Sequence, residues 1–304
     1  MKTNEKGQKI VPFLWFDDRA EEAVNLYTSI FNDSGIIDTT HYNREWSRVA
    51  WRPEWSVMSI EFKIWWVEFT ALNWGPDFQF TPAISYYVGC ETAEELDGLW
   101  GKLSEGWKIL MDLDSYPFSK RYWWTQDRFG VSWQLNLVNE NQKITPMLMF
   151  VGDVFWKAEE AMKFYTSIFK DSEIKDVYLY WEGEGDVEWK VKHASFILDS
   201  FEFKAMESSL DHKFNFSLAN SFVVNCETQE EIDDKWGKLT QGGWEPWECG
   251  WLKDKYWVSW QVVPPKLDMI LDDEDEERWN RVMAAMLKMS KIDIATLRQA
   301  YKNE

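Results

Sequence analysis

Two glutamines stand at matching places in the sequence and are the first candidates for contact with a ligand. Gln134 ends the motif DRFGVSWQ and Gln261 ends DKYWVSWQ, each directly after a strand-borne tryptophan, Trp133 or Trp260. A buried glutamine can satisfy backbone groups inside a fold, or it can orient a small molecule against aromatic walls. The sequence leaves both interpretations open, and we predict these four residues as ligand contacts.

A second matched pair consists of Asn73 in ALNWGPDF and Glu207 in AMESSLDH, each at the end of a strand just before a loop. Polar residues at loop edges on a rigid scaffold are reasonable ligand contacts, and they can equally cap the turn. We predict both as ligand-binding residues. Glu207 has the chemistry of a general base, but no paired acid or nucleophile completes a mechanism.

The histidines do not supply the missing catalytic groups. His41, His193 and His212 are scattered through the chain and are more typical of surface or hydrogen-bonded histidines than of ligands. No Ser/His/Asp or Cys/His arrangement can be assembled from them. The sequence therefore assigns no catalytic residue and leaves open whether the protein is an enzyme.

These candidates recur because the chain repeats itself. KIVPFLWFDDRAEEAVNLYTSIF from Lys9 is matched by KITPMLMFVGDVFWKAEEAMKFYTSIF from Lys143, and SYYVGCETAEELDGLWGKL by SFVVNCETQEEIDDKWGKL. Matched landmarks in the same order indicate a duplication. The boundary falls in the polar stretch around residues 138–142. We predict domains at residues 1–139 and 140–267, followed by a helical tail at 268–304.

Within each half, the hydrophobic pattern predicts strand, helix and further strands, twice over. Residues 10–16 form an apolar strand, and Ala20 to Phe31 have the one-faced spacing of a helix, with Asp18 and Glu21 as its start pair. Residues 58–64 alternate as a half-buried strand does. Thr92 with Glu95, and Thr228 with Glu231, form capping boxes for two more helices. The fold class is therefore α+β, built from tandem βαβββ modules.

The tail has a different character. After the acidic run DDEDEE, apolar residues recur at helical spacing: Trp279, Val282, Met283, Met286 and Met289. A second short helix, DIATLRQAY, follows. We expect helices packed on their own domain or on a partner chain; a methionine-rich recognition helix is the alternative.

Composition excludes several classes of partner. The 304 residues carry a net charge of −19, which argues against nucleic acid and against anionic membrane surfaces. There is no apolar run of membrane-spanning length, and the first residues do not form a secretion signal. Cys90, Cys226 and Cys249 form no CxxC pair, which fits a reducing cytoplasm. We expect a cytoplasmic protein.

The segments FLWFDDRAEEAVNLYTSIF, AISYYVGCETAEELDGLWGKL and DRFGVSWQL resemble the PhnB-like branch of the vicinal-oxygen-chelate (glyoxalase/bleomycin-resistance) superfamily. The resemblance covers nearly the whole chain, twice. It implies paired βαβββ modules in cupped, mostly antiparallel sheets, and dimers or tandem pseudo-dimers. Members of this branch often carry a 3-demethylubiquinone-9 3-methyltransferase name, but no Gly-rich turn of an S-adenosylmethionine site follows any apolar strand here.

Metal-dependent members of that superfamily hold a divalent ion with His, Gln and Glu on facing strands. A tight site needs three or four convergent ligands, because fewer cannot offset the cost of dehydrating the ion. Matched by motif, the ligand positions fall on Val11, Thr145, Ala83, Asn220, Gln134 and Gln261. Since most of these side chains are apolar or neutral, we expect no metal and no cofactor.

The 22 tryptophans are unusual for a chain of this length. Trp257 stands where the other half has Gly130, and Trp65-Trp66 stands where the other half has the ordinary turn pair Asp199-Ser200. Other tryptophans among loop residues are Trp46, Trp51, Trp55, Trp74, Trp181, Trp189, Trp244 and Trp247. Three interpretations compete: an aromatic pocket or interface, deliberate enrichment of a natural parent, or an uncertain sequence assignment. Placement at turns favours the last two.

The sequence thus predicts a small-molecule binding protein that works without a metal and whose physiological ligand is unknown. The alternatives are a divalent-metal-dependent lyase, isomerase or dioxygenase-like enzyme, and a scaffold in which a homodimer surface matters most. The expected partner is a small-molecule ligand, with neither nucleic acid nor membrane.

Overall fold

Four modules of similar build follow one another in the computed structural model, which describes residues 7–106, 108–138, 144–243, 245–265 and 275–302. The first module contains β1 (Ile10–Phe16), α1 (Ala20–Ile30), β2 (Gly35–His41), α2 (Arg44–Val49), β3 (Val57–Ile64) and β4 (Val67–Asn73). The second contains β5 (Ile84–Cys90), α3 (Ala93–Leu103), β6 (Ile109–Tyr116), β7 (Ser119–Gln126) and β8 (Ser132–Leu137).

The second half of the chain repeats this order. Its first module contains β9 (Ile144–Phe150), the 3-10 turn η1 (Gly152–Val154), α4 (Ala158–Ile168), β10 (Glu173–Leu179), β11 (Val191–Leu198) and β12 (Phe201–Glu207). The last module contains β13 (Asn220–Asn225), α5 (Gln229–Leu239), β14 (Glu245–Pro246), β15 (Trp251–Lys253) and β16 (Ser259–Val263). The tail forms α6 (Glu276–Met286) and α7 (Ile294–Lys302).

The modules pair across the two halves of the sequence. One eight-stranded sheet, sheet A, has the order β14-β15-β16-β13-β1-β4-β3-β2, and the other, sheet B, has the order β10-β11-β12-β9-β5-β8-β7-β6. Most neighbouring strands are antiparallel; β1 joins β13 by an antiparallel ladder from Ile10 opposite Val224 to Leu14 opposite Asn220. Each sheet therefore takes one module from each half, and the α+β architecture of tandem βαβββ modules is confirmed.

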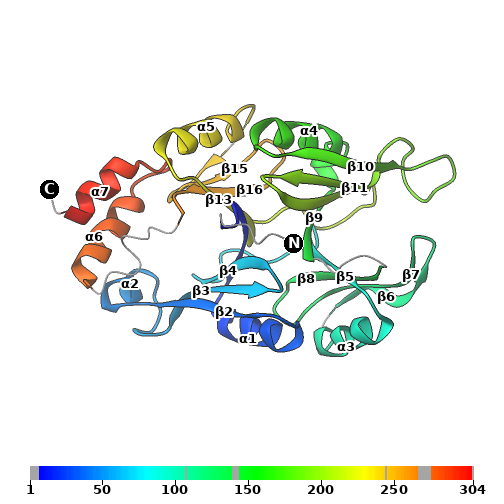
Figure 1. Ribbon diagram of the computed structural model, residues 1–304, viewed down its shortest axis with the longest axis horizontal. Coiled ribbons are helices and arrows are strands. Elements are labelled where there is room, and N and C mark those ends of the chain that lie inside the picture. The colour runs from blue at the N-terminus through cyan, green and yellow to red at the C-terminus, as the bar shows by residue number, and fades with distance from the viewer. Residues whose placement is uncertain (1–6, 107, 139–143, 244, 266–274, 303–304) are drawn as a thin grey trace.

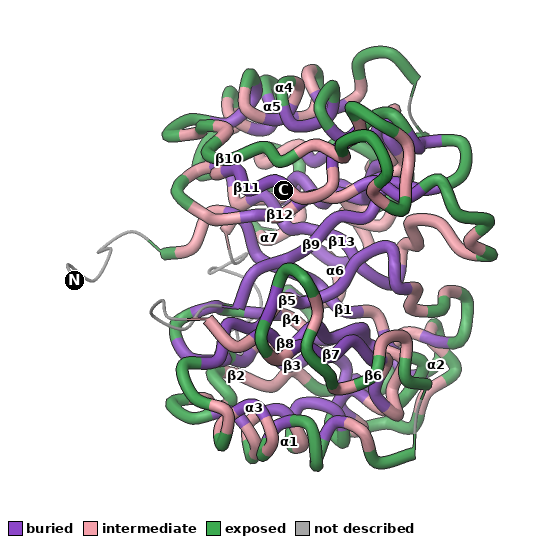
Figure 2. Tube along the Cα trace, turned by 90° about the vertical axis from the view of Figure 1, so that its right-hand side faces the viewer, coloured by how far each residue is buried: buried purple, intermediate pink, exposed green. Residues whose placement is uncertain are grey.

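Helices cover the outer side of each sheet. In Figure 1, α4 and α5 lie along one side of the molecule and α1 and α3 along the other, with the strands between them. α1 packs on β3 and β4, and α5 on β16, so these two helices back sheet A. Figure 2 shows the central strands buried and the outward turns of the helices exposed. The opposite face of each sheet is left to form a cup.

Each of the two large hydrophobic cores comes mainly from one half of the sequence, although the second-half core also includes Tyr42, Trp46 and Met58. One core joins α1, α3 and the strands of the first half, including Tyr27, Phe62 and Trp133. The other joins α4, α5 and the strands of the second half with the tail, including Tyr165 and Trp260. The expected boundary around 138–142 and the start of the tail at 268 fall largely on residues outside the described ranges. The domain limits remain a prediction.

Two of the three expected helix starts are confirmed. The Thr92 hydroxyl accepts from the Glu95 amide, and the Thr228 hydroxyl from the Glu231 amide, as a capping box requires. The prediction that Asp18 and Glu21 form the start pair of this helix was wrong. The residue before α1 is Arg19, which makes no side-chain cap, because Asn73 from β4 accepts from the Ala20 amide instead.

The tail bridges both halves of the chain. Trp279 of α6 packs edge-on against Trp46 of α2, with ring centroids 5.6 Å apart. The amides of Cys249 and Gly250 donate to the carbonyls of Met289 and Ser290. The expectation that the tail packs on its own domain is therefore met in part, since α6 also contacts the first half.

Several tryptophans occupy backbone conformations that glycine prefers. Gly130 has φ +89° and its counterpart Trp257 has φ +72°. Among the described residues, the other tryptophans with positive φ are Trp51, Trp55, Trp65, Trp156 and Trp189. The left-handed conformation costs a residue with a Cβ about 1–2 kcal/mol. The origin of these tryptophans stays a prediction. Within the described ranges, no helix is long and apolar enough to cross a membrane.

Candidate functional site

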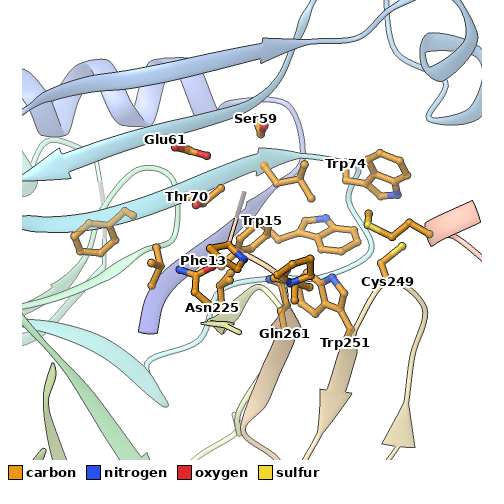
Figure 3. Close-up of a pocket in the computed structure, with 18 of the residues that line it drawn as sticks. Phe13, Trp15, Ser59, Glu61, Thr70, Trp74, Asn225, Cys249, Trp251 and Gln261 are labelled. Atoms are coloured by element: carbon orange, nitrogen blue, oxygen red, sulfur yellow. The ribbon is translucent and has the colours of Figure 1, made fainter. Parts of the chain in front are cut away.

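The concave face of sheet A forms a half-open cavity of about 630 Å³. Figure 3 shows that its walls come from the first-half strands on one side and from the second-half strands on the other. Cavities of roughly 300–1,000 Å³ are typical of small-molecule sites. The site exists only because the two halves share a sheet.

Strand register brings the polar lining together. Ile60 and Phe62 of β3 point into the core, so Ser59 and Glu61 face the cavity, since side chains alternate along a strand. Glu61 lies opposite Thr70 of β4, and Thr70 opposite Phe13 of β1. One row of the sheet thus carries a carboxylate, a hydroxyl and an aromatic ring into the same hollow (Figure 3).

A second row carries the predicted glutamine. Gln261 of β16 lies opposite Val223 of β13 and opposite Trp251 of β15. The Gln261 side-chain amide donates to the Ser221 hydroxyl at 3.0 Å, which fixes the orientation of the side chain. Of the six predicted contacts, Gln261 belongs to the described lining of this cavity.

Aromatic rings form one wall of the cavity. The ring of Trp251 meets Phe13 at 5.4 Å and 89°, and meets Trp15 at 5.6 Å and 76°. Trp74 and Trp247, two tryptophans that the sequence placed in loops, also line the hollow. Edge-to-face packing fixes these rings at steep angles to one another, so a ligand here would meet ring faces and ring edges from several directions.

The end of the cavity near the tail is closed by sulfur-containing and aliphatic side chains. Met283, Met286 and Leu287 line it from α6 and its end, beside Cys249. Burial, with a smaller contribution from Glu248, raises the pKa of the Cys249 thiol to about 12. Because the thiolate is the nucleophile, this cysteine contributes packing rather than covalent chemistry near neutral pH.

The corresponding cup of sheet B is filled by its own side chains. Gln134 accepts from the Tyr122 hydroxyl at 2.7 Å and donates to the Ser85 hydroxyl at 2.7 Å. Tyr122 packs with Trp124 and Met149 in a small apolar cluster. The β6–β7 hairpin that supplies Tyr122 and Trp124 is long, whereas β14 and β15 in sheet A are short. Tyr122 and Trp124 of this longer hairpin bond to Gln134 and Ser132 and lie over the strands of the sheet B cup.

The predicted tryptophans lie on the core side of their strands. The Trp133 indole donates to Asp127 at 2.8 Å, and the Tyr27 hydroxyl donates to the same carboxylate at 2.6 Å. Trp260 and Tyr165 bond to Asp254 in the same way. Desolvation by burial raises the pKa of Asp127 and of Asp254 to about 6, against the lowering effect of these donors.

Sequence reasoning missed this buried carboxylate. The shared first residue of DRFGVSWQ and DKYWVSWQ, at matching places in both halves, was the signal that could have found it. Each aspartate also accepts two backbone amides of its own turn, as Asp127 does from Phe129 and Val131. Its role is to tie helix, turn and strand together beneath each sheet.

Asn73 and Glu207 hold matching structural bonds. Asn73 accepts from the Ala20 amide at 2.9 Å and donates to the Val57 carbonyl at 3.1 Å. The Glu207 carboxylate accepts from the amides of Ala158 and Val191 at 2.9 and 2.7 Å. In each half the side chain joins the start of a helix to the start of a strand.

The residues at the superfamily's metal positions do not fit an ion. On sheet A, Val11 has no donor atom, and the Asn220 side-chain oxygen already accepts a hydrogen bond from the Tyr86 hydroxyl. Among the described residues, no group of three His, Cys, Asp or Glu side chains is placed to hold a metal. His193, on β11, is half-buried, and desolvation with the nearby Lys204 charge lowers its pKa to about 4. We derive no chemistry through a metal.

Paired βαβββ modules whose sheet curves around a cavity define a glyoxalase-like fold. Glyoxalase I from Zea mays is 11% identical over 83% of this chain and 90% of its own, with a TM-score of 0.51. The model of the 3-demethylubiquinone-9 3-methyltransferase family matches residues 8–136 and again 142–263, so the chain belongs to this family.

Part of the chain is also similar in sequence to a solved protein. A PhnB protein from Bacillus cereus is 44% identical over 43% of this chain and 100% of its own, with a TM-score of 0.40. The comparison with curated proteins gave no match. The repeat, the PhnB-like resemblance and the glyoxalase-like architecture expected from the sequence are thus confirmed.

Proposed function

We propose that this protein binds a small organic molecule in the sheet A cavity and does so without a metal ion. The observation that carries the proposal is the half-open hollow of about 630 Å³, with aromatic walls and a few polar side chains directed inward. An apolar pocket with a small number of placed polar groups is the usual form of a ligand site. Methyl transfer is no part of the proposal, because the chain has no Gly-rich turn for the donor.

Among the predicted contacts, we assign Gln261 to this site. The other five, Gln134, Trp133, Trp260, Asn73 and Glu207, stay predictions; all five are buried and hold hydrogen bonds within the protein. The cytoplasmic location and the homodimer also stay predictions.

The test exploits the duplication. Val223 in the sheet A cavity corresponds to Tyr87 in the filled cup of sheet B. Val223→Tyr therefore copies a filling side chain into the open cup, and Tyr87→Val is the matched control in the other sheet. Binding of Nile red, a neutral apolar dye, is measured by fluorescence titration of each purified protein.

We expect Val223→Tyr to weaken dye binding at least tenfold, while Tyr87→Val leaves the affinity within a factor of two. Equal affinities for the unaltered protein and Val223→Tyr, or no saturable binding to either, would refute the proposal. Metal analysis of the purified protein tests the metal-dependent alternative: near-stoichiometric zinc, nickel, manganese or iron would favour the enzyme.

A further inference from the structure

We propose that the sheet A cavity takes a neutral ligand with an aromatic hydroxyl group, and that this hydroxyl donates a hydrogen bond to the side-chain oxygen of Gln261. This inference rests on the proposed function, because it names the chemical class of the ligand for the same site. It follows from the filled cup of sheet B, where a side chain of the protein itself occupies the matching place.

Strand register allows the two cups to be compared position by position. Each cup has a glutamine that lies opposite a tryptophan of the neighbouring strand, Trp124 in sheet B and Trp251 in sheet A. Two residues before that tryptophan, sheet B has Tyr122 and sheet A has Cys249. Cys249, which lines the cavity, therefore stands where the filled cup has a tyrosine.

The hydroxyl of Tyr122 shows what the glutamine of this scaffold can hold. In sheet B it donates to the Gln134 side-chain oxygen at 2.7 Å, while the Gln134 amide group donates to the Ser85 hydroxyl. In sheet A the Gln261 amide group makes the equivalent bond to the Ser221 hydroxyl. Within the described part of the chain, however, no group donates to the Gln261 side-chain oxygen, although this side chain is buried. The open cup has the same glutamine without the phenol.

The free oxygen of Gln261 decides the chemistry of the ligand. An amide oxygen accepts hydrogen bonds and cannot donate them, so a carboxylate, a ketone or an ether has no bond to make with it. A ligand that covers this oxygen without donating to it leaves a buried acceptor unsatisfied, which weakens binding. The ligand therefore needs a donor, and the Tyr122 side chain indicates a hydroxyl on an aromatic ring.

Smaller side chains leave room for such a group in sheet A. Three residues of the cavity lining are smaller than their counterparts in sheet B: Cys249 for Tyr122, Val223 for Tyr87 and Val263 for Asn136. Two phenol rings and one amide of the filled cup are therefore missing from the open one. A ligand with an aromatic hydroxyl would supply one of these rings from outside the chain.

The walls beside Gln261 suit an aromatic ring. In sheet B, Tyr122 packs with Trp124 and Met149. Trp251 and Trp15 stand at the two matching places in sheet A, with ring centroids 5.6 Å apart at 76°. Figure 3 shows Gln261, Trp15 and Trp251 around the same hollow. Edge-to-face contacts with these rings favour an aromatic body over an aliphatic one.

A second hydrogen bond of the filled cup is also missing from the open one. In sheet B the Trp124 indole donates to the Ser132 hydroxyl at 2.9 Å. Ser259 stands at the matching place in sheet A, and its buried hydroxyl has no hydrogen-bond partner among the described residues. Buried polar groups normally have partners. The cup of sheet A thus keeps polar groups whose partners in sheet B come from the chain itself, as expected where a ligand completes the site.

The experiment compares 2-naphthol with 2-methylnaphthalene, which has the same rings and a methyl group of similar size in place of the hydroxyl. Each probe displaces Nile red from the unaltered protein, from Gln261→Met and from Tyr122→Phe. Gln261→Met keeps the length of the side chain and removes the amide oxygen. Tyr122→Phe removes the matching hydrogen bond in sheet B and is the control outside the cavity.

We expect 2-naphthol to bind about fivefold tighter than 2-methylnaphthalene to the unaltered protein and to Tyr122→Phe, the effect of one net hydrogen bond. In Gln261→Met this preference should vanish or reverse, because the methyl compound is the more hydrophobic probe.

If 2-methylnaphthalene binds the unaltered protein as tightly as 2-naphthol does, the ligand class is wrong while the binding site stands. If the preference survives Gln261→Met in full, the role of Gln261 is refuted. Should Gln261→Met fail to bind the dye, a crystal of the unaltered protein soaked with 2-naphthol decides: a hydroxyl at the Gln261 oxygen supports the inference, and a hydroxyl placed elsewhere overturns it. If Nile red does not bind to the unaltered protein, the proposed function fails first.

Discussion

The buried carboxylate of Asp127 makes the stability of the fold depend on pH in an unusual direction. Asp127 is fully buried and accepts four hydrogen bonds, from Tyr27, Trp133, Phe129 and Val131. Asp127→Asn removes the titrating group and keeps the size of the side chain. The variant should lose part of the pH dependence that the unaltered protein shows.

The sign follows from the raised pKa. Burial moves the pKa of Asp127 from an ordinary 3.8 to about 6, so the folded protein holds this proton more tightly than the unfolded chain does. The resulting stabilisation is complete below the unfolded pKa and is lost as the pH rises through about 6. Between pH 7.5 and pH 5, linkage of this one group predicts a gain of about 1.4 kcal/mol in the free energy of unfolding.

The assay is urea unfolding of both proteins at pH 5 and at pH 7.5, followed by tryptophan fluorescence. The difference in pH dependence between the two proteins reports on Asp127 alone, because all other carboxylates are the same in both. Asp254→Asn is the matched variant in the other half, where burial also raises the pKa to about 6. Either variant should also be less stable at both pH values, because an amide cannot accept all of the buried donors. Identical pH dependence in the unaltered protein and in both variants would refute the reasoning.

Two further predictions concern the backbone. Trp51 has φ +55° and is 92% exposed, so Trp51→Gly should raise the free energy of unfolding by about 1 kcal/mol, because it relieves the left-handed strain and removes little packing. The control is Trp66→Gly, at an exposed site without positive φ, which should bring no gain. Equal effects of the two substitutions in thermal unfolding would contradict this account. Gly250 has φ +79°, and a Cβ there would lie 2.7 Å from the Val262 carbonyl oxygen and 3.2 Å from Ile292. Gly250→Ala should therefore loosen the tail by about 2 kcal/mol or more, seen as faster hydrogen exchange in α6 and α7; unchanged exchange would show that the tail is held elsewhere.

The sequence was most informative about local structure and about the repeat. The apolar strand at residues 10–16 and the alternation at 58–64 predicted β1 and β3, because strand periodicity reports which side chains share a face. Thr92 and Thr228 located two helix starts, since a capping box is entirely local. The start of α1 was wrong because its cap, Asn73, comes from another strand.

The pairing of modules could not be predicted from the same patterns. Alternation shows that one face of β1 is buried, but it does not show that β1 joins β13 from the other half. The candidate site could not be predicted fully for the same reason, because its residues come from both halves of the sequence. Gln261 was found from its place after Trp260, whereas Glu61 lies in the strand at residues 58–64 and was not singled out. Both side chains line the same hollow as Trp251, because the two halves share a sheet.

The central claim is that the open cup of sheet A, and not the filled cup of sheet B, is the ligand site. A crystal structure of the protein soaked with Nile red tests this most directly. The account predicts one dye molecule per chain, lying against Trp251 and Gln261. A dye molecule beside Gln134 in sheet B, or a metal ion bound by Gln261, would contradict it.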